Sequence, residues 1–197
     1  NPEPRWLVSA KYRLYDHVIT ISEGIREVLL SEGLPPEKVS CVRSAVDAKP
    51  YLVNYDKVAY RTKLGLAADT PLAGMVAQLI ERKGHRHLLA ALPEVLRQHP
   101  RLQVLIFGRG PLEAEIKQAI IDQDLSDNVR LMGFVDNLPT VLGCLDLLVH
   151  PADMEGLGVS LLQASAARVP IIASRAGGMP EAVRDGENGL LIAPGDV

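Results

Sequence analysis

One segment, residues 151–164, combines an acid, two glycines and the start of a helical pattern. Glu155 precedes Gly156 and Gly158, and an apolar strand pattern over residues 145–149 lies directly upstream. A strand, a glycine loop and a helix N-terminus in that order form an anion site, because free backbone N–H groups point outward and the helix dipole favours negative charge. Glycine also lets a ligand approach the main chain closely. An acid beside bound phosphate could hold hydroxyl groups, so the segment is typical of a nucleotide-sugar site.

The same segment resembles the E-x7-E signature of the retaining glycosyltransferases of family 4. Glu155 matches the first acid, and Gln163 stands where the family has the second. The resemblance implies that Glu155 holds hydroxyls of the transferred sugar, and that Gly156, Leu157, Gly158 and Val159 offer N–H groups to the diphosphate. It also implies that residue 163 meets the ribose, where glutamine can accept a hydrogen bond but brings no charge. The alternatives are an ordinary capped turn and a helical glutamine without a role.

A second segment places a cation at the end of another predicted strand. Residues 74–84 resemble the family pattern V-G-R-L-x-x-x-K-G. Lys83 matches its phosphate-binding lysine, and ligands bind at the carboxyl ends of strands in such sheets. Gln78 stands where the family usually has arginine, and Arg82 could substitute from a different backbone position. The alternative for Lys83 is a solvated loop lysine.

Three further matches to the family are less specific. Gly133, Phe134 and Val135 resemble G-[FY]-V, where an apolar wall with backbone groups suits a nucleotide base. Residues 108–111 resemble G-x-G-P, although a structural strand-to-helix turn explains them better. Residues 177–183 match G-G-x-P-E-x-V, whose glycines fit either close ligand approach or plain turn chemistry.

The histidines and cysteines show no metal-binding spacing. His85 and His87 are two apart on a predicted helix and face different sides. His150 ends the strand before the glycine loop, where it could line a crevice, although packing or a surface position is the more common role. Cys41 and Cys144 are too few and too scattered for a disulfide framework or a zinc site. The sequence therefore predicts no metal, and the family resemblance implies a metal-independent reaction without a cofactor.

Composition and charge narrow the class of protein. The 197 residues are 47% hydrophobic and 23% charged, with a formal net charge of −3, which is ordinary for a soluble globular protein. No basic stripe supports nucleic-acid binding. No apolar run reaches the ~18 residues of a membrane span, and no signal peptide is recognisable. With few cysteines, a reducing cytoplasm is the expected compartment.

Apolar, β-branched runs alternate with helical patterns along the chain, which predicts a parallel sheet covered on both faces. Strands are expected at His17–Ile21, Lys38–Val42, Leu72–Ala77, Gln103–Phe107, Asn128–Met132, Leu145–Val149, Ile171–Ala173 and Gly189–Ile192. Helices are expected at Glu23–Ser31, Asp56–Leu64, His85–Gln98, Leu112–Asp122, Leu138–Leu142, Val159–Ala167 and Met179–Arg184.

A boundary is expected near residues 48–56, which lack apolar periodicity. Residues 1–50 are interpreted as the end of an N-terminal acceptor domain and its linker, because two strands are too few for a core. Residues 51–197 are expected to form a C-terminal, Rossmann-like nucleotide-sugar-binding domain. The resemblance implies a doubly wound α/β fold of the GT-B type, with the active site between two domains. The abrupt ends suggest a fragment that lacks most of the acceptor domain and the last C-terminal helix, and that is inactive alone.

We therefore expect a retaining glycosyltransferase that moves a sugar from a UDP-, GDP- or ADP-sugar to a saccharide or lipid-linked acceptor. Glu155 and Lys83 are its catalytic candidates. Peripheral contact with the inner face of a membrane, through the missing domain, is compatible with this interpretation. The alternatives are a nucleotide-sugar epimerase or phosphorylase of the same fold, and a catalytically weak binding module. The glutamines at positions 78 and 163 keep the last alternative open.

Overall fold

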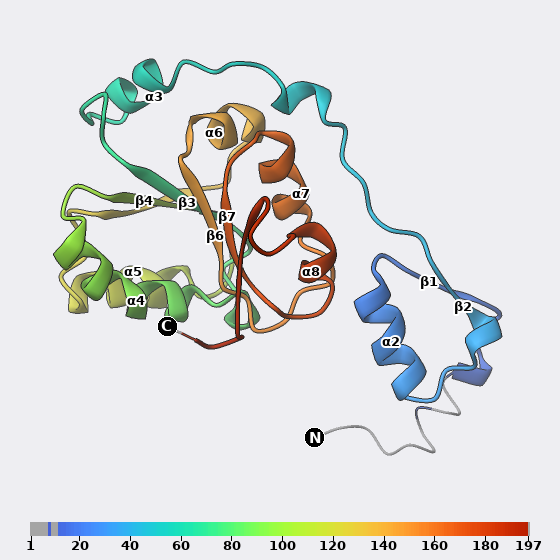
Figure 1. Ribbon diagram of the computed structural model, residues 1–197. Coiled ribbons are helices and arrows are strands. Elements are labelled where there is room, and N and C mark those ends of the chain that lie inside the picture. The colour runs from blue at the N-terminus through green and yellow to red at the C-terminus, as the bar shows by residue number, and fades with distance from the viewer. Residues whose placement is uncertain (1–7, 9–11, 197) are drawn as a thin grey trace.

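The computed structural model describes residue 8 and residues 12–196 (Figure 1). Within these residues, six parallel strands form one sheet and two further strands form a smaller one. The strands of the large sheet are β3 (Leu72–Val76), β4 (Gln103–Phe107), β5 (Val129–Gly133), β6 (Leu147–His150), β7 (Ile171–Ser174) and β8 (Gly189–Ile192). Their nearly continuous apolar character suits a parallel sheet that is buried on both faces.

The spatial order of the large sheet is β5-β4-β3-β6-β7-β8, with every pairing parallel. This is the doubly wound Rossmann order, in which the chain direction across the sheet reverses between β3 and β6. Ligands bind such sheets in the crevice outside the carboxyl ends of the strands at that reversal. The topology therefore singles out the loops that follow β3 and β6.

Helices cover both faces of the sheet (Figure 1). One face carries α4 (His85–Gln98) and α5 (Glu113–Asp122), and the other carries α6 (Leu138–Cys144), α7 (Val159–Ala166) and α8 (Met179–Ala182). Each layer has its own apolar core. Leucines of α4 pack with isoleucines of α5 on the first face, and leucines of α6 and α7 pack on the second.

A smaller unit lies beside the large one, next to the loops that contain Gly156 and Gly177. It consists of β1 (Val18–Thr20), α2 (Glu23–Ser31), a 3₁₀ turn over Pro36–Lys38 and β2 (Val39–Cys41), with β1 and β2 parallel. Its core is small, and several of its apolar side chains are exposed. The buried ones include Tyr12, Leu34 and Val39, and the exposed ones include Ile19, Val28 and Val42.

The connection between the two units contains a short turn. Within residues 48–56, where a boundary is expected, Lys49–Tyr51 forms a 3₁₀ turn. Tyr51 is buried in the core between α6 and α7. The chain then enters α3 (Lys57–Lys63), whose N-cap Asp56 accepts a hydrogen bond from a backbone N–H of its first turn.

The predicted α/β fold class is confirmed, and every predicted strand and helix is found with small differences at its ends. The strand predicted from Leu145 begins at Leu147, because α6 continues to Cys144. The helix predicted to reach Arg184 ends at Ala182, because Val183 is extended. Both differences lie at element ends, which local sequence patterns place only to within one or two residues.

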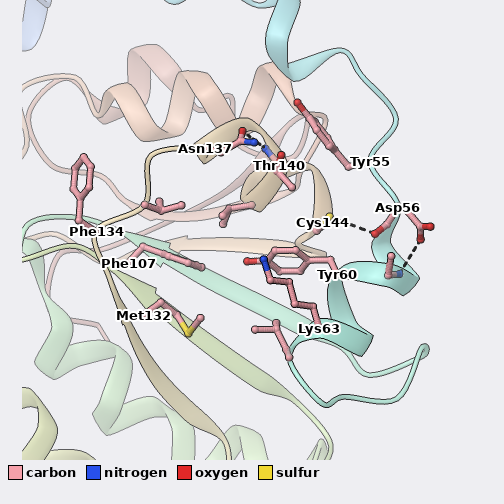
Figure 2. Close-up of a pocket in the computed structure, with 14 residues that line it drawn as sticks. Tyr55, Asp56, Tyr60, Lys63, Phe107, Met132, Phe134, Asn137, Thr140 and Cys144 are labelled. Atoms are coloured by element: carbon pink, nitrogen blue, oxygen red, sulfur yellow. Dashed lines mark hydrogen bonds between the residues drawn. The ribbon is translucent and has the colours of Figure 1, made fainter.

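A cavity of about 540 Å³ lies between α3, α6 and the sheet (Figure 2). Tyr60 and Phe107 point into it from α3 and β4, and Met132 does so from β5. Its lining is mainly apolar, with Lys63 and Asn137 among its polar members. The cavity reaches Phe134 and therefore adjoins the region that the sequence assigns to the nucleotide base.

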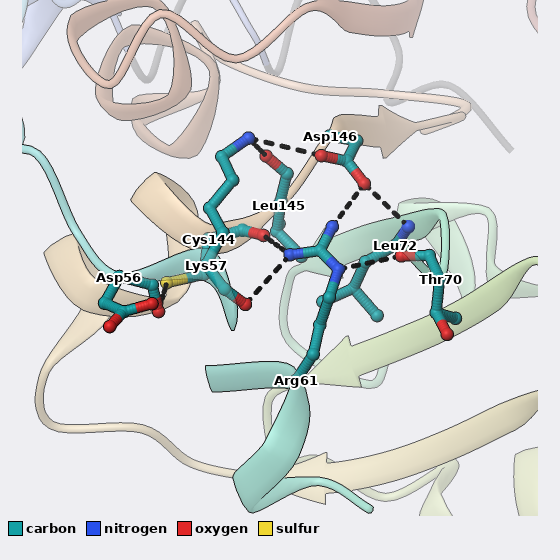
Figure 3. A network of polar contacts seen from close by, with 8 residues as sticks. All are labelled: Asp56, Lys57, Arg61, Thr70, Leu72, Cys144, Leu145 and Asp146. Atoms are coloured by element: carbon teal, nitrogen blue, oxygen red, sulfur yellow. Dashed lines mark hydrogen bonds and ion pairs between the residues drawn. The ribbon is translucent and has the colours of Figure 1, made fainter. Parts of the chain in front are cut away.

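At the opposite, amino-terminal edge of the sheet, a buried guanidinium group ties α3 to the strands (Figure 3). Arg61 donates to the backbone carbonyls of Thr70, Lys57 and Cys144 at 2.8, 3.2 and 3.2 Å and pairs with Asp146 at 2.5 Å. Asp146 also accepts from the backbone N–H of Leu72 at 3.0 Å. The bonds to Thr70 and Cys144 satisfy carbonyl groups just before β3 and at the C-terminal end of α6.

Replacing Arg61 with leucine should lower the free energy of unfolding by about 3 kcal/mol, because three carbonyls and one carboxylate lose a charged donor. The matched control is Arg101→Leu, which breaks an ion pair with Asp69 whose two side chains are 66% and 69% exposed. That change should cost less than about 1 kcal/mol. Urea denaturation of both variants tests the contrast, and equal losses would contradict the structural role of Arg61.

Candidate active site

The reversal of the sheet brings two loops together: residues 77–84 after β3 and residues 151–158 after β6. Asp153 fastens the second loop to the first. Its backbone N–H donates to the carbonyl of Arg82 at 2.9 Å, and its carboxylate contacts Arg86 and His87 at 2.9 and 2.8 Å. Arg82 in turn donates to the carbonyl of Met154 at 3.2 Å. Arg82 thus supports the loop from an exposed position.

Gly84 allows these loops to approach each other. Its φ of 76° lies in the left-handed region, and a Cβ atom there would collide with the carbonyl of Pro151. Only glycine fits without strain at this point. The preceding residue, Lys83, ends a 3₁₀ turn over Glu81–Lys83 and is thereby directed toward the second loop.

Lys83, Glu155 and His150 form a buried charged cluster. The Lys83 Nζ atom pairs with Glu155 Oε2, and the side chains of these two residues are only 10% and 12% exposed. The same carboxylate oxygen lies 3.2 Å from Nε2 of His150, which is 1% exposed. The backbone N–H of Gly156 donates to the other carboxylate oxygen at 2.9 Å. Lys83 is therefore not the solvated loop lysine that the sequence left open.

The cluster keeps Glu155 ionised. Burial alone would raise the pKa of this carboxyl group, but the hydrogen bond from His150, and then the hydrogen bond and charge of Lys83, lower it to about 2. A lysine ammonium group has three donors, so Lys83 can hold Glu155 and still offer N–H groups to a phosphate. The arrangement can therefore bind a ligand that carries an anion beside a polyol.

The N-terminus of α7 supplies further donors. Gly158 is its N-cap with a φ of 81°, and α7 begins at Val159. The backbone N–H groups of Leu157, Gly158, Val159 and Ser160 donate to no other group in the part of the chain that the structure describes. Free N–H groups at a helix N-terminus suit an anion. Three of the four predicted N–H donors, on Leu157, Gly158 and Val159, are thus available to an anion, whereas the N–H of Gly156 is bonded to the Glu155 carboxylate and not free for a phosphate.

The residues predicted to face the base lie at or just after the end of β5, and Gln78, predicted to lie near the phosphates, follows β3. Gln78 and Val135 line a cavity of about 440 Å³, together with Phe134 and Arg109. The Arg109 guanidinium carbon lies 5.6 Å from the centre of the exposed Phe134 ring, which is a cation–π distance. Gly133 ends β5 with a φ of 69°, and its carbonyl accepts from the backbone N–H of Gly108 at 2.8 Å. This flat, partly apolar lining suits an aromatic base.

Gln163 has a neighbour that the sequence did not indicate. Its side chain hydrogen-bonds to the hydroxyl of Tyr51, which comes from the connection between the units. Burial raises the pKa of Tyr51, and this hydrogen bond opposes that shift. Gln163 is partly exposed on α7, so its interaction with a ribose stays a prediction.

Sequence reasoning did not assign His150 and His85 to the site. Position offered one signal for His150, because it is the last residue of a strand whose carboxyl end faces the crevice. His85 is 2% exposed, and neither of its ring nitrogens has a hydrogen-bond partner among the described residues. Burial, and then the charges of His150 and Lys83, lower the pKa of His85 to about 4.

His85 should make the protein less stable in mild acid. Its pKa falls from 6.5 in the unfolded chain to about 4 in the fold, so the unfolded chain binds the additional proton between these values. The free energy of unfolding should therefore decrease as the pH falls from 6.5 to 4. His85→Leu should remove this loss and exceed the parent protein by up to about 3 kcal/mol at pH 4.

The measurement is urea denaturation at pH 4 and pH 7, with His99→Leu on the exposed end of α4 as the control. The control should follow the parent at both pH values. A His85→Leu variant whose stability relative to the parent were the same at both pH values would contradict the buried, neutral state of His85.

Comparison with known proteins agrees with this geometry. The fold is that of GT-B glycosyltransferases: an Anabaena protein, Alr3699/HepE, solved with UDP and glucose, superposes with a TM-score of 0.86 at 25% identity, over 98% of this chain and 53% of that one. The family model "Glycosyl transferases group 1" matches residues 56–197. The chain therefore belongs to the group 1 glycosyltransferase family.

Two curated relatives are mannosyltransferases. A GDP-mannose-dependent monoacylated alpha-(1-6)-phosphatidylinositol monomannoside mannosyltransferase of Corynebacterium glutamicum is 35% identical, over 78% of this chain and 42% of the relative. A GDP-mannose-dependent alpha-(1-6)-phosphatidylinositol monomannoside mannosyltransferase of Mycobacterium tuberculosis is 34% identical, over 90% of this chain and 48% of the relative. The chain thus spans about half the length of these relatives.

The described residues lack two kinds of feature. They contain no group of three or more histidine, cysteine, aspartate or glutamate side chains arranged to hold a metal ion. No helix among them is long and apolar enough to cross a membrane.

Proposed function

We propose that this chain carries the donor-binding part of a retaining glycosyltransferase of family 4, which uses a UDP-, GDP- or ADP-sugar. The observation that carries the proposal is the cluster of Lys83, Glu155 and His150 at the reversal of a Rossmann sheet. A cation and free helix N–H groups suit the diphosphate, and an ionised acid beside them suits sugar hydroxyls. Membership of the glycosyltransferase family supports this assignment.

The proposed catalysis is electrostatic. Lys83 and the N–H groups of Leu157, Gly158 and Val159 stabilise the negative charge that develops on the departing diphosphate, while the N–H of Gly156 holds the Glu155 carboxylate. Glu155, held by His150 and Lys83, positions the sugar ring. The departing phosphate then assists attack by the acceptor on the same face of the sugar, which retains the configuration. No protein nucleophile is needed in this scheme.

The remaining predicted residues have binding roles. Gln78 and Arg82 flank the phosphates, Gly133 and Val135 form the wall against the base, and Gln163 meets the ribose. The placement of Gln78 and Val135 on one cavity supports the base and phosphate assignments. Because Gln163 is bonded to Tyr51, ribose recognition would involve both residues.

The donor base is best decided by binding. The mannosyltransferase relatives are named for GDP-mannose, whereas the Anabaena neighbour was solved with UDP. A thermal-shift screen of UDP-, GDP- and ADP-sugars distinguishes them, because a ligand at about 100 times its Kd stabilises by roughly 2.7 kcal/mol. The absence of stabilisation by every nucleotide-sugar would contradict the proposed function.

The small unit of β1, α2 and β2 is proposed to be the end of an acceptor domain. A parallel sheet is normally covered on both faces, yet Ile19 of β1 is exposed, as are Val28 on α2 and Val42 directly after β2. An additional layer of structure would cover them.

The acceptor itself is proposed to be a saccharide or a lipid-linked molecule at the cytoplasmic face of a membrane. The relatives' phosphatidylinositol substrates, which their names record, support the lipid-linked choice. This chain alone should bind donor without transferring sugar.

Lys83→Ala should weaken binding of the preferred nucleoside diphosphate by about 10- to 100-fold, because a hydrogen bond to a charged group contributes about 1.5–3 kcal/mol. Binding of the corresponding nucleoside, which lacks phosphate, should change far less. Calorimetric titration of both ligands tests this, with the exposed Lys117→Ala as control. Equal weakening of both ligands would contradict the phosphate role, since general damage to the fold affects both.

Glu155→Gln, tested in a chain that also contains the acceptor domain, should reduce kcat by about 100-fold, because small displacements of the reacting ring have such costs. The opposite exchange, Gln163→Glu, should tighten donor binding by about tenfold at most, because it turns one neutral hydrogen bond into a charged one. Steady-state kinetics of the two variants provide the comparison. A near-normal kcat in the Glu155→Gln variant would contradict the catalytic assignment of Glu155 and would leave its loop with a structural role only.

A further inference from the structure

The acid of the G-G-x-P-E motif joins three segments that are distant in the sequence. Glu181 lies on α8, yet its carboxylate bonds to other elements. One oxygen accepts from the backbone N–H of Gly24 on α2 at 2.9 Å, and the other accepts from Arg43 Nε at 2.7 Å. Burial would raise the pKa of Glu181, but the bonds from Arg43 and from the α2 backbone outweigh it and lower the pKa. Glu181 is therefore ionised, and it links α8 to α2 and to the segment after β2.

Glycines bring the segments that Glu181 links into direct backbone contact. A Cβ atom on Gly24 would lie 2.7 Å from the carbonyl oxygen of Gly177, so a side chain there would push α2 away. A Cβ atom on Gly177 would collide with the carbonyl of Glu155. The N-terminus of α2 thus meets the backbone of residues 177–178, and this segment in turn meets the backbone of the Glu155 loop.

Three hydrogen bonds hold these segments together. Ser22, the N-cap of α2, donates to the carbonyl of Gly156 at 2.6 Å. The backbone N–H of Gly178 lies 3.2 Å from the carbonyl oxygen of Glu155 and 3.1 Å from that of Gly156. The loop that carries Glu155 therefore takes its position from α2 as well as from Lys83.

We propose that Glu181 is a positioning residue for sugar transfer: by holding Gly24 and Arg43, it fixes the N-terminus of α2 against the Glu155 loop. This inference rests on the proposed function. Glu181 acts through the backbone and touches no substrate. It sets how the small unit, proposed to belong to the acceptor domain, meets the loop that orients the donor sugar. Gly177, Gly178 and Glu181 of the motif then share one role, which is to place α2 against the Glu155 loop.

A plain structural role for Glu181 within α8 does not account for the contacts. An acid in the first turn of a helix commonly caps its own N–H groups. The carboxylate of Glu181 instead bonds to residues 157 and 138 positions away in the sequence.

The test is Glu181→Gln in a chain that contains both proposed domains. Glutamine has a similar size, but its NH₂ group cannot accept, so at least one of the two contacts is lost. We expect the ratio of sugar transfer to donor hydrolysis to fall at least tenfold, since a displacement near 1 Å costs about 100-fold in rate. Nucleoside diphosphate affinity should stay within about twofold. This ratio does not depend on the fraction of active enzyme, so partial unfolding does not imitate the effect.

Glu187→Gln is the matched control, because that exposed acid pairs with Arg184 and with no other side chain among the described residues, and it should leave the ratio unchanged. If Glu181→Gln folds poorly, Arg43→Ala removes the same bond from the exposed side and should lower the ratio as well. An unchanged ratio in a folded variant overturns the positioning role while the proposed function stands. A parent protein that neither binds nor transfers a nucleotide-sugar overturns the proposed function itself.

Discussion

The ion pair between Lys83 and Glu155 is the constraint on which the rest of the site depends. Both side chains are nearly removed from water, and a buried charge without its partner costs about 3–5 kcal/mol. The loops after β3 and β6 must therefore stay together for either charge to be tolerated. His150 and the Gly156 N–H complete the surroundings of the carboxylate. The same charges that stabilise the ligand-free loops are the ones that a phosphate and a sugar need.

Several other features of the fold hold together the two loops that carry Lys83 and Glu155. The order of the strands puts both loops at one crevice, and glycine at position 84 lets their backbones touch. Asp153 joins the loops from the outer side, and Glu181 holds α2 behind them. At the other edge of the sheet, Arg61 fixes α3 to the strand ends. The structural contacts of Arg61 and the proposed binding site thus lie at opposite edges of the sheet, and the proposed site lies at the carboxyl ends of the strands, where sheets of this kind bind ligands.

Much of the fold was predictable because strands and helices follow local periodicity. The meeting of Lys83 and Glu155, 72 residues apart, followed from the parallel order and from resemblance to a family. His150 was not assigned, because a histidine at a strand end has the same local pattern whether it packs or binds. The burial of Tyr51 and the bonds that Glu181 makes to Gly24 and Arg43 were also missed. Both features depend on contacts with segments that are distant in the sequence. Tyr51 also lies in a short proline-containing turn, which has no periodicity that would reveal its burial.

A crystal structure with the preferred nucleotide-sugar bound tests the central claim most directly. We predict that Lys83 Nζ lies within ~3.2 Å of a diphosphate oxygen. Glu155 should accept hydrogen bonds from hydroxyls of the transferred sugar in the same complex. A nucleotide-sugar bound elsewhere, with the Lys83–Glu155 pair unchanged and in contact with no part of the ligand, would contradict the account.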